Sequence, residues 1–96
     1  MRVLLVVHGF VQGVGYRNLV RKIAVKNGVR GMVKNADNGT VEIIAEADSE
    51  NLEAFEKAIN VDMKNGPSVL SIEKHCDGDT LFPAITKVYE GFIIEH

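Results

Sequence analysis

Residues 9–18, GFVQGVGYRN, combine three glycines with one arginine and contain no acidic residue. They fall between a run that predicts a strand and a run that predicts a helix. A loop that leads into a helix collects backbone N–H groups without helical partners, and the helix dipole adds positive potential there. Glycines allow the backbone to approach a ligand more closely than side chains would. The composition of this loop therefore indicates an anion site, and we expect a phosphate there.

Arg17 follows the loop, in the first turn of the predicted helix. Its planar guanidinium can bind two phosphoryl oxygens at once, whereas a lysine would supply only a point charge. An anion site here would be formed by the backbone of Val11, Gln12, Gly13, Val14, Gly15 and Tyr16 together with Arg17.

Two known phosphate loops do not fit this segment. A Walker loop ends in lysine and a hydroxyl residue, which are absent here. A dinucleotide-binding fingerprint requires a third glycine where Asn18 stands. A tight turn without a ligand remains the alternative as long as this segment is taken alone.

Length and composition indicate one soluble domain over residues 1–96. Hydrophobic residues make up 46% of the chain and charged residues 25%, as in an average globular protein. The apolar run Val3–Val7 is far shorter than the roughly 20 residues of a membrane span, and no cleavage signal follows it. One cysteine, Cys76, cannot form an internal disulfide, which fits a reducing compartment. We predict a cytoplasmic protein that does not bind membranes.

Charge is distributed unevenly along the chain, although the net charge is only −2. Residues 1–34 carry seven basic residues and no acid, whereas the remainder carries four lysines against thirteen acids. A locally positive surface of this kind can steer a small anion toward the loop. A solvated basic helix face without any ligand is the alternative.

The first half of the chain predicts a strand, a helix and a hairpin. Residues 2–8 are β-branched and leucine-rich with little alternation, which predicts a central strand buried on both faces. From Tyr16 the apolar residues follow a helical period, and Gly28 supplies a left-handed C-cap. Within residues 29–47, Asn38-Gly39 predicts a hairpin with a type I′ turn.

The second half predicts a helix and two strands. Asp48 or Ser49 caps the helix, and Asn65-Gly66-Pro67 ends it. Its apolar stripe is formed by Leu52, Phe55, Ile59 and Met63, with Met63 in the core. Residues 68–76 predict a strand, residues 77–88 a loop, and residues 89–96 a short last strand.

The predicted order is βαββαβ plus a C-terminal strand. Two helices on one face of a mostly antiparallel sheet form the ferredoxin-like split βαβ arrangement, an α+β fold. This fold hosts unrelated functions, so the function has to be argued from a site.

Two segments resemble the signatures of the acylphosphatase family: GFVQGVGYR (9–17) is similar to the first and GMVKNADNGTVEIIAEA (31–47) to the second. The resemblance extends from about residue 3 to residue 75. It implies that the loop amides and Arg17 bind the phosphate of an acyl phosphate and that Asn35 orients the attacking water, without a metal or other cofactor.

The chain departs from the family pattern at two positions. Met32 replaces a usual aromatic residue, and Ala47 replaces a usual glycine. Both look like packing positions, so they bear on substrate fit and hairpin geometry more than on chemistry. Residues 77–90 match the family poorly.

The implied chemistry suits these residues. The carboxylate that leaves an acyl phosphate needs little protonation, and a loose transition state needs no strong base. What remains is charge stabilisation and positioning of the water, which N–H donors, an arginine and a neutral amide can provide. We predict an acylphosphatase that is a monomer and releases inorganic phosphate from a small-molecule acyl phosphate. We expect Gln12 to brace the loop and His8 to have a structural role.

Two other functions remain open at this stage. One is a catalytically silent, regulatory module that binds phosphate or carbamoyl phosphate, as in the N-terminal domain of a hydrogenase-maturation carbamoyl transferase. The other is RNA binding, because RNA-recognition domains share the fold. Those domains stack bases on sheet aromatics, and this chain has only four phenylalanines and two tyrosines. We therefore expect no nucleic-acid partner.

Overall fold

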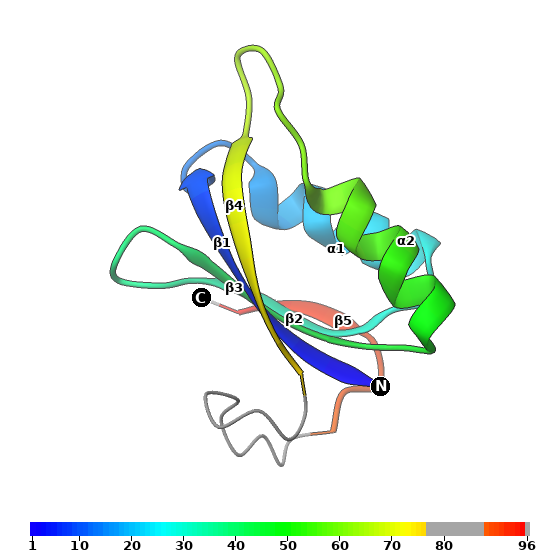
Figure 1. Ribbon diagram of the computed structural model, residues 1–96. Coiled ribbons are helices and arrows are strands. Elements are labelled where there is room, and N and C mark those ends of the chain that lie inside the picture. Colours follow the sequence, from blue (N-terminus) through cyan, green and yellow to red (C-terminus); the bar gives the residue numbers. More distant parts are fainter. Residues whose placement is uncertain (77–87, 96) are drawn as a thin grey trace.

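The computed structural model describes residues 1–76 and 88–95 (Figure 1). Its elements are β1 (Arg2–Phe10), α1 (Tyr16–Lys26), β2 (Arg30–Asn35), β3 (Val41–Glu46), α2 (Ser49–Ile59), β4 (Ser68–Cys76) and β5 (Phe92–Glu95). The five strands form one sheet in the order β4-β1-β3-β2-β5. Neighbouring strands are antiparallel except β2 and β5, which are parallel. Both helices lie on one face of this sheet, so the predicted ferredoxin-like α+β fold is confirmed. The loop predicted over residues 77–88 lies outside the described residues except for Val88.

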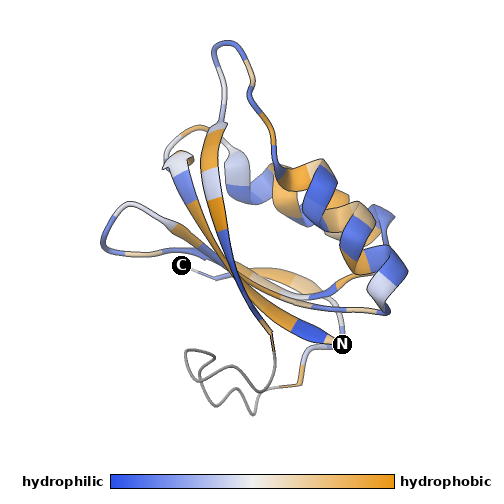
Figure 2. Cartoon of the chain, viewed as in Figure 1, coloured by the Kyte–Doolittle hydropathy of each residue, from blue (hydrophilic) through white to orange (hydrophobic). Residues whose placement is uncertain are grey.

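The hydrophobic core lies between the sheet and the two helices. Alternate residues of β1 point into it, and Val3, Leu5 and Val7 are completely buried. The helices contribute Tyr16, Val20 and Ala24 from α1 and Leu52, Phe55 and Ile59 from α2. Figure 2 shows hydrophobic residues along the strands and alternating with polar residues around the helices. Each fully buried aliphatic or aromatic side chain contributes about 1.5–3 kcal/mol, so this layer fixes the positions of both helices.

The prediction that the first strand is buried on both faces is wrong. Leu4, Val6 and His8 face away from the helices and are partly exposed. Both helices cover the same face, which is how an antiparallel sheet keeps one face toward the solvent. A smaller cluster on the other face contains Met32, Ile44 and Tyr89, with Leu4 packed against it.

The predicted hairpin is confirmed, with Asn35 opposite Val41, but the predicted turn type is wrong. A type I′ turn needs a positive φ at both Asn38 and Gly39, and only Gly39 has one, at 90°. The Gly39 N–H donates to Ala36 O (3.2 Å), and the Ala36 N–H donates to Thr40 O (2.9 Å). This is a three-residue loop ending in a left-handed glycine. The side chain of Asn38 holds it, because Oδ1 accepts from the Thr40 N–H (3.1 Å) and hydroxyl (2.6 Å).

The second helix begins as predicted and ends earlier. The Asp48 carboxylate caps α2 by accepting from the Asn51 N–H at 2.8 Å. The helix ends at Ile59, and Met63 is 48% exposed, so the prediction of Met63 as core filler is wrong. β-branched Val61 favours an extended backbone, and its carbonyl accepts from the Val69 N–H at 2.8 Å. The chain therefore turns into β4 instead of continuing the helix.

Candidate phosphate-binding site

The connection from β1 to α1 exposes a stretch of backbone. Gly13 and Gly15 have φ values of 74° and 78°, a left-handed conformation that side chains disfavour. A Cβ atom at either position would have no neighbour within 4 Å, so the glycines are needed for the backbone conformation and not for packing. The space above them is open to a ligand.

Helix α1 begins at this loop without a side-chain cap. Its N-cap residue is Gly15, and its first turn contains no acid. The first helical hydrogen bond runs from the Leu19 N–H to Gly15 O (3.1 Å), which leaves the N–H groups of Tyr16 and Asn18 outside the helical pattern. Helix α2, by contrast, is closed by the Asp48 carboxylate. The positive end of α1 is therefore available to an external anion.

The loop is anchored to the core beneath it. Val11 and Tyr16 are each only 1% exposed, and Val14 packs against the same core cluster. The Tyr16 hydroxyl donates to Ile59 O at 2.9 Å, and burial raises the pKa of this hydroxyl well above its usual range. These three side chains support the loop, so any contact they make with an anion comes from their backbone.

Gln12 connects the loop to the β2–β3 hairpin. Its Nε2 donates to Ala36 O (2.8 Å) and to Thr40 O (2.9 Å), so the side chain braces the loop as the sequence predicts. Ala36 directly follows Asn35, the last residue of β2. The brace therefore joins the loop to the residue next to Asn35, which is predicted to orient water.

Asn35 presents an unsatisfied acceptor. Its Oδ1 is buried and has no hydrogen-bond partner among the residues that the structure describes. Buried polar atoms in proteins almost always have a partner, and such an exception calls for an explanation. Because the atom has almost no exposed surface, a water or ligand would supply the missing donor only after a small movement of the amide or its neighbours.

Arg17, in the first turn of α1, contacts the C-terminal end of β5. It is partly buried, and its Nη1 donates to Glu95 O at 3.4 Å. Glu95 pairs with Lys34, the neighbour of Asn35 in β2. In Figure 1 the hairpin and the C-terminal end of β5 lie at the left, below the β1–α1 loop, and hydrogen bonds of Gln12 and Arg17 connect this end of the molecule. The carbonyl of Glu95 is a contact that sequence reasoning missed, because a backbone carbonyl leaves no signal in residue type.

Most other charges near the sheet are paired. Glu46 of β3 contacts Arg2 at 3.1 Å and Arg30 at 3.0 Å, and Glu42 contacts Lys34 at 3.6 Å. The positive excess of residues 1–34 is therefore carried mainly by α1, where Lys22 and Lys26 are exposed. Among residues 1–76 and 88–95 there is no group of three His, Cys, Asp or Glu that could hold a metal ion.

His8 lies on the uncovered face of the sheet. Its Nε2 is 2.9 Å from Glu73 Oε2, and this hydrogen bond lowers the pKa of the Glu73 carboxyl. The pair ties β1 to the edge strand β4, which agrees with the predicted structural role of His8.

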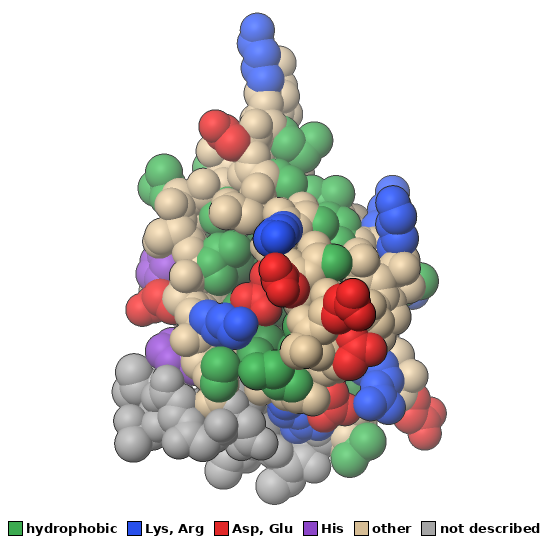
Figure 3. Space-filling view, turned by 45° about the vertical axis from the view of Figure 1, so that its right-hand side comes forward, with side chains coloured by type: hydrophobic (Ala, Val, Ile, Leu, Met, Phe, Trp, Pro, Cys, Tyr) green, Lys and Arg blue, Asp and Glu red, His purple; other side chains and the backbone are tan. Residues whose placement is uncertain are grey.

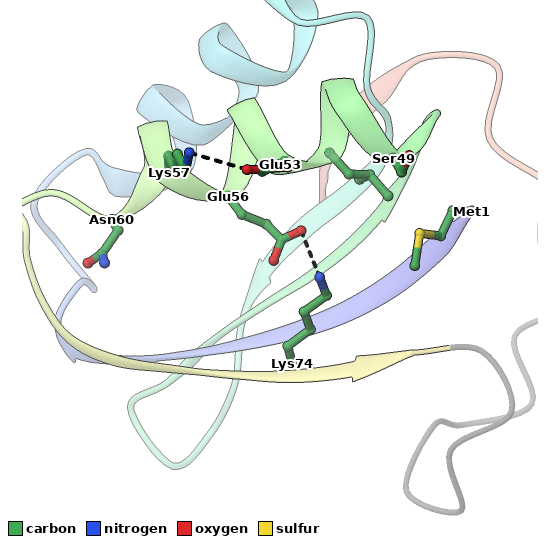
Figure 4. A pocket seen from close by; sticks show the side chains of 8 residues that line it. Met1, Ser49, Glu53, Glu56, Lys57, Asn60 and Lys74 are labelled. Carbon is green, nitrogen blue, oxygen red and sulfur yellow. Dashed lines mark hydrogen bonds and ion pairs between the residues drawn. The ribbon is translucent and has the colours of Figure 1, made fainter.

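A separate pocket of about 490 Å³ lies between α2 and the sheet (Figure 4). Its charged side chains pair with one another, Lys57 with Glu53 at 3.3 Å and Lys74 with Glu56 at 3.2 Å. The rest of the lining is Met1, Ser49, Leu52 and Asn60, so no residue of the glycine loop belongs to it. This pocket is not the predicted anion site.

No helix in the part of the chain described is long and apolar enough to span a membrane.

The fold is that of an α+β protein in which a glycine-rich loop leads into a helix N-terminus without a side-chain cap. A family model described as Acylphosphatase matches residues 3–81. The chain therefore belongs to the acylphosphatase family, as its two signatures predict.

Known proteins are similar to the chain in sequence and structure. An acylphosphatase of Listeria welshimeri is 52% identical over 65 residues, which are 68% of this chain and 66%, just under two thirds, of that protein. The crystal structure of acylphosphatase from Bacillus subtilis has a TM-score of 0.76 at 32% identity and covers 99% of this chain and 98% of its own. HypF from T. kodakarensis has a TM-score of 0.81 at 30% identity, over 100% of this chain and 12% of that one.

The two departures from the family pattern occupy packing positions. Met32 is only 4% exposed and lies in the cluster with Ile44 and Tyr89. Ala47 packs partly against the main core, and its N–H donates to Met1 O at 3.1 Å. Met32 is thus covered on the sheet face where an RNA-recognition domain would stack a base.

Proposed function

We propose that this protein is an acylphosphatase that hydrolyses the carboxyl–phosphate anhydride of small acyl phosphates. The observation that carries the proposal is the Oδ1 of Asn35, which is buried and lacks a partner among residues 1–76 and 88–95, together with the nearby loop whose helix has no carboxylate cap. The uncapped helix N-terminus can bind an anion, and the Asn35 Oδ1 can accept a hydrogen bond from water. Hydrolysis of a phosphate anhydride requires both at adjacent positions.

In the proposed mechanism the N–H groups of the loop and the Arg17 guanidinium bind the nonbridging phosphoryl oxygens. They stabilise the charge that these oxygens carry in a loose transition state. Asn35 accepts a hydrogen bond from water and turns the water lone pair toward phosphorus. The new P–O bond forms as the bond to the acyl oxygen breaks, and the carboxylate leaves with that electron pair. The proton lost by the attacking water goes to the phosphate or to solvent.

No general acid or base is required from the protein. The carboxylate is a stable leaving group, and the two titratable side chains nearest the loop in sequence are otherwise engaged: His8 pairs with Glu73, and the Tyr16 hydroxyl donates to Ile59 O. A cradle that binds mainly the phosphoryl group leaves the acyl group loosely recognised. We therefore propose broad tolerance for the acyl group, with inorganic phosphate as product.

We also propose that the protein acts without a cofactor, as a single-domain monomer in the cytoplasm. Its one cysteine and its mixed surface charge support this proposal. Sedimentation at micromolar concentration tests the monomer directly, and we expect a mass near the 10.5 kDa of one chain. A dimer mass would contradict the monomer.

The activity is tested by following benzoyl phosphate hydrolysis beside hydrolysis of p-nitrophenyl phosphate, a monoester with a poorer leaving group. We expect turnover of the anhydride, at least 10²-fold slower hydrolysis of the ester, and no effect of EDTA on either rate. Phosphate binding without any turnover of benzoyl phosphate would instead support the silent binding module.

A further inference from the structure

Gln12 holds both ends of the β2–β3 loop with one amide group. Its Nε2 donates to Ala36 O at the end of β2 and to Thr40 O before β3. Thr40 O also accepts from the Ala36 N–H at 2.9 Å. One side chain from the glycine loop thus binds the backbone on both strands of the hairpin where its loop begins and ends.

The opposite side of this hairpin is fixed independently. Asn38 Oδ1 binds both the N–H and the hydroxyl of Thr40, and Thr40 is only 6% exposed. These bonds restrain the hairpin loop from within. Pairing of Val41 with Val7 of β1 holds its base in the sheet, and the Gln12 amide adds a direct restraint to the glycine loop at the residue that follows Asn35.

Position matters here because Asn35 acts only through geometry. A neutral amide can align a water only if it stays fixed relative to the bound phosphate, and misplacement by about 1 Å can cost about 10² in rate. Arg17 and the loop N–H groups belong to the β1–α1 segment, whereas Asn35 belongs to the hairpin. The two segments must keep a fixed position relative to each other, so that the water lies in line with the P–O bond that breaks.

We propose that Gln12 is a positioning residue, which acts through its side chain by holding Asn35 in register with the phosphate cradle. This inference rests on the proposed acylphosphatase activity. The side chain of Gln12 does not contact the phosphate in this scheme. Its loss should slow the chemical step and leave phosphate binding nearly intact.

The test compares wild type with Gln12→Met, which keeps the length of the side chain and removes both donated hydrogen bonds. We expect kcat for benzoyl phosphate to fall at least tenfold, with less than a threefold change in inhibition by inorganic phosphate. The matched control is Asn27→Ala, which removes a side-chain amide bond to Ile23 O (2.9 Å) at the other end of α1. Its kcat should stay within twofold of wild type.

A double-mutant cycle shows whether Gln12 acts through Asn35. In an Asn35→Ala background, Gln12→Met should change kcat less than twofold, because the group it positions is gone. Additive losses, or equal weakening of phosphate inhibition and kcat, would overturn the inference. If Gln12→Met does not fold, Gln12→Asn, whose amide is too short to reach both carbonyls, provides the same comparison. An inactive wild type would overturn the proposed function itself, whereas an active wild type with an unchanged Gln12→Met would overturn only this inference.

Discussion

Gly15 illustrates how a single residue serves the proposed site without contacting anything through a side chain. It is the N-cap of α1 in a left-handed conformation, with open space where a Cβ atom would be. Any other residue there would strain the backbone that presents the N–H groups. Arg17 and Asn35 differ from it, because their proposed roles depend on their side chains: Arg17 donates to the Glu95 carbonyl of β5, and Asn35 is the last residue of β2.

We predict that Gly15→Ala weakens inorganic phosphate binding at least tenfold. The substitution should also lower the free energy of unfolding by about 1–2 kcal/mol, the usual cost of a left-handed non-glycine residue. Isothermal titration and urea unfolding measure the two quantities.

Gly28→Ala is the matched control. Gly28 has a similar φ of 67°, and its nearest prospective neighbour is Asn51 Nδ2 at 3.8 Å, away from the loop. A similar loss of stability with unchanged phosphate binding is expected. If both variants weakened phosphate binding equally, the effect would come from general destabilisation and not from the cradle.

At the level of elements, the two helices differ in what completes their N-termini. Asp48 caps α2, whereas Gly15 is the N-cap of α1 and Arg17 lies in the first turn of that helix. Asn18 and Asn51 are the third residues of α1 and α2, and both are exposed. They allow the same charge to be placed at the same helical position in each helix.

We predict that Asn18→Asp weakens phosphate binding several-fold, because a carboxylate at the positive end of α1 competes with the anion. The expected size follows from the 0.3–1 kcal/mol that a charge near a helix terminus typically contributes. Asn51→Asp should leave phosphate binding unchanged. Titrations at low and high salt should show the Asn18→Asp effect shrinking as salt screens the charge. Equal effects of the two variants would contradict a site at α1.

Element order was predictable because hydrophobic period, caps and turn residues are local signals. The strand Ser68–Cys76 and the start of α1 at Tyr16 agree with the prediction to the residue. The end of α2 does not agree with the prediction. Met63 continues the helical stripe in the sequence, but the Val61 carbonyl accepts a hydrogen bond from the Val69 N–H. That bond is tertiary and leaves no periodic signal.

The residues of the candidate site could be named from the sequence, and their roles stay predictions, but their contacts in the fold could not be named. Glycines, an arginine and an asparagine at given spacing indicate types of contact. The pairing of Arg17 with the carbonyl of Glu95, 78 residues away, depends on β5 lying parallel to β2. The open face of β1 likewise depends on where both helices pack.

At the scale of the whole molecule, the two helices differ in charge. Acidic side chains gather on the side of α2 in Figure 3, with a few basic side chains among them. Helix α1 has no acid in its sequence and carries Arg17, Arg21, Lys22 and Lys26. The proposed dianionic substrate would therefore be attracted toward the end of the molecule where the proposed cradle lies.

We predict that kcat/KM for benzoyl phosphate falls about three- to tenfold between 0.01 M and 0.5 M NaCl, while kcat changes little. The Debye length falls from about 30 Å at 0.01 M to below 10 Å over this range, so steering is screened and contact within the cradle is not. The double variant Lys22→Glu/Lys26→Glu should show a flatter salt dependence, since both side chains are exposed on α1. A salt-independent kcat/KM in wild type would contradict steering.

The decisive experiment compares phosphate binding and benzoyl phosphate turnover in Arg17→Ala and Asn35→Ala. We predict that Arg17→Ala loses both, with turnover reduced more than about 10³-fold, because the guanidinium binds the phosphoryl group in ground and transition states. Asn35→Ala should bind phosphate within about threefold of wild type and lose about 10²–10³ in kcat, because it holds only the water. Near-normal turnover in either variant, or equal loss of phosphate binding in both, would contradict the division of the site into a phosphate cradle and a water-orienting amide.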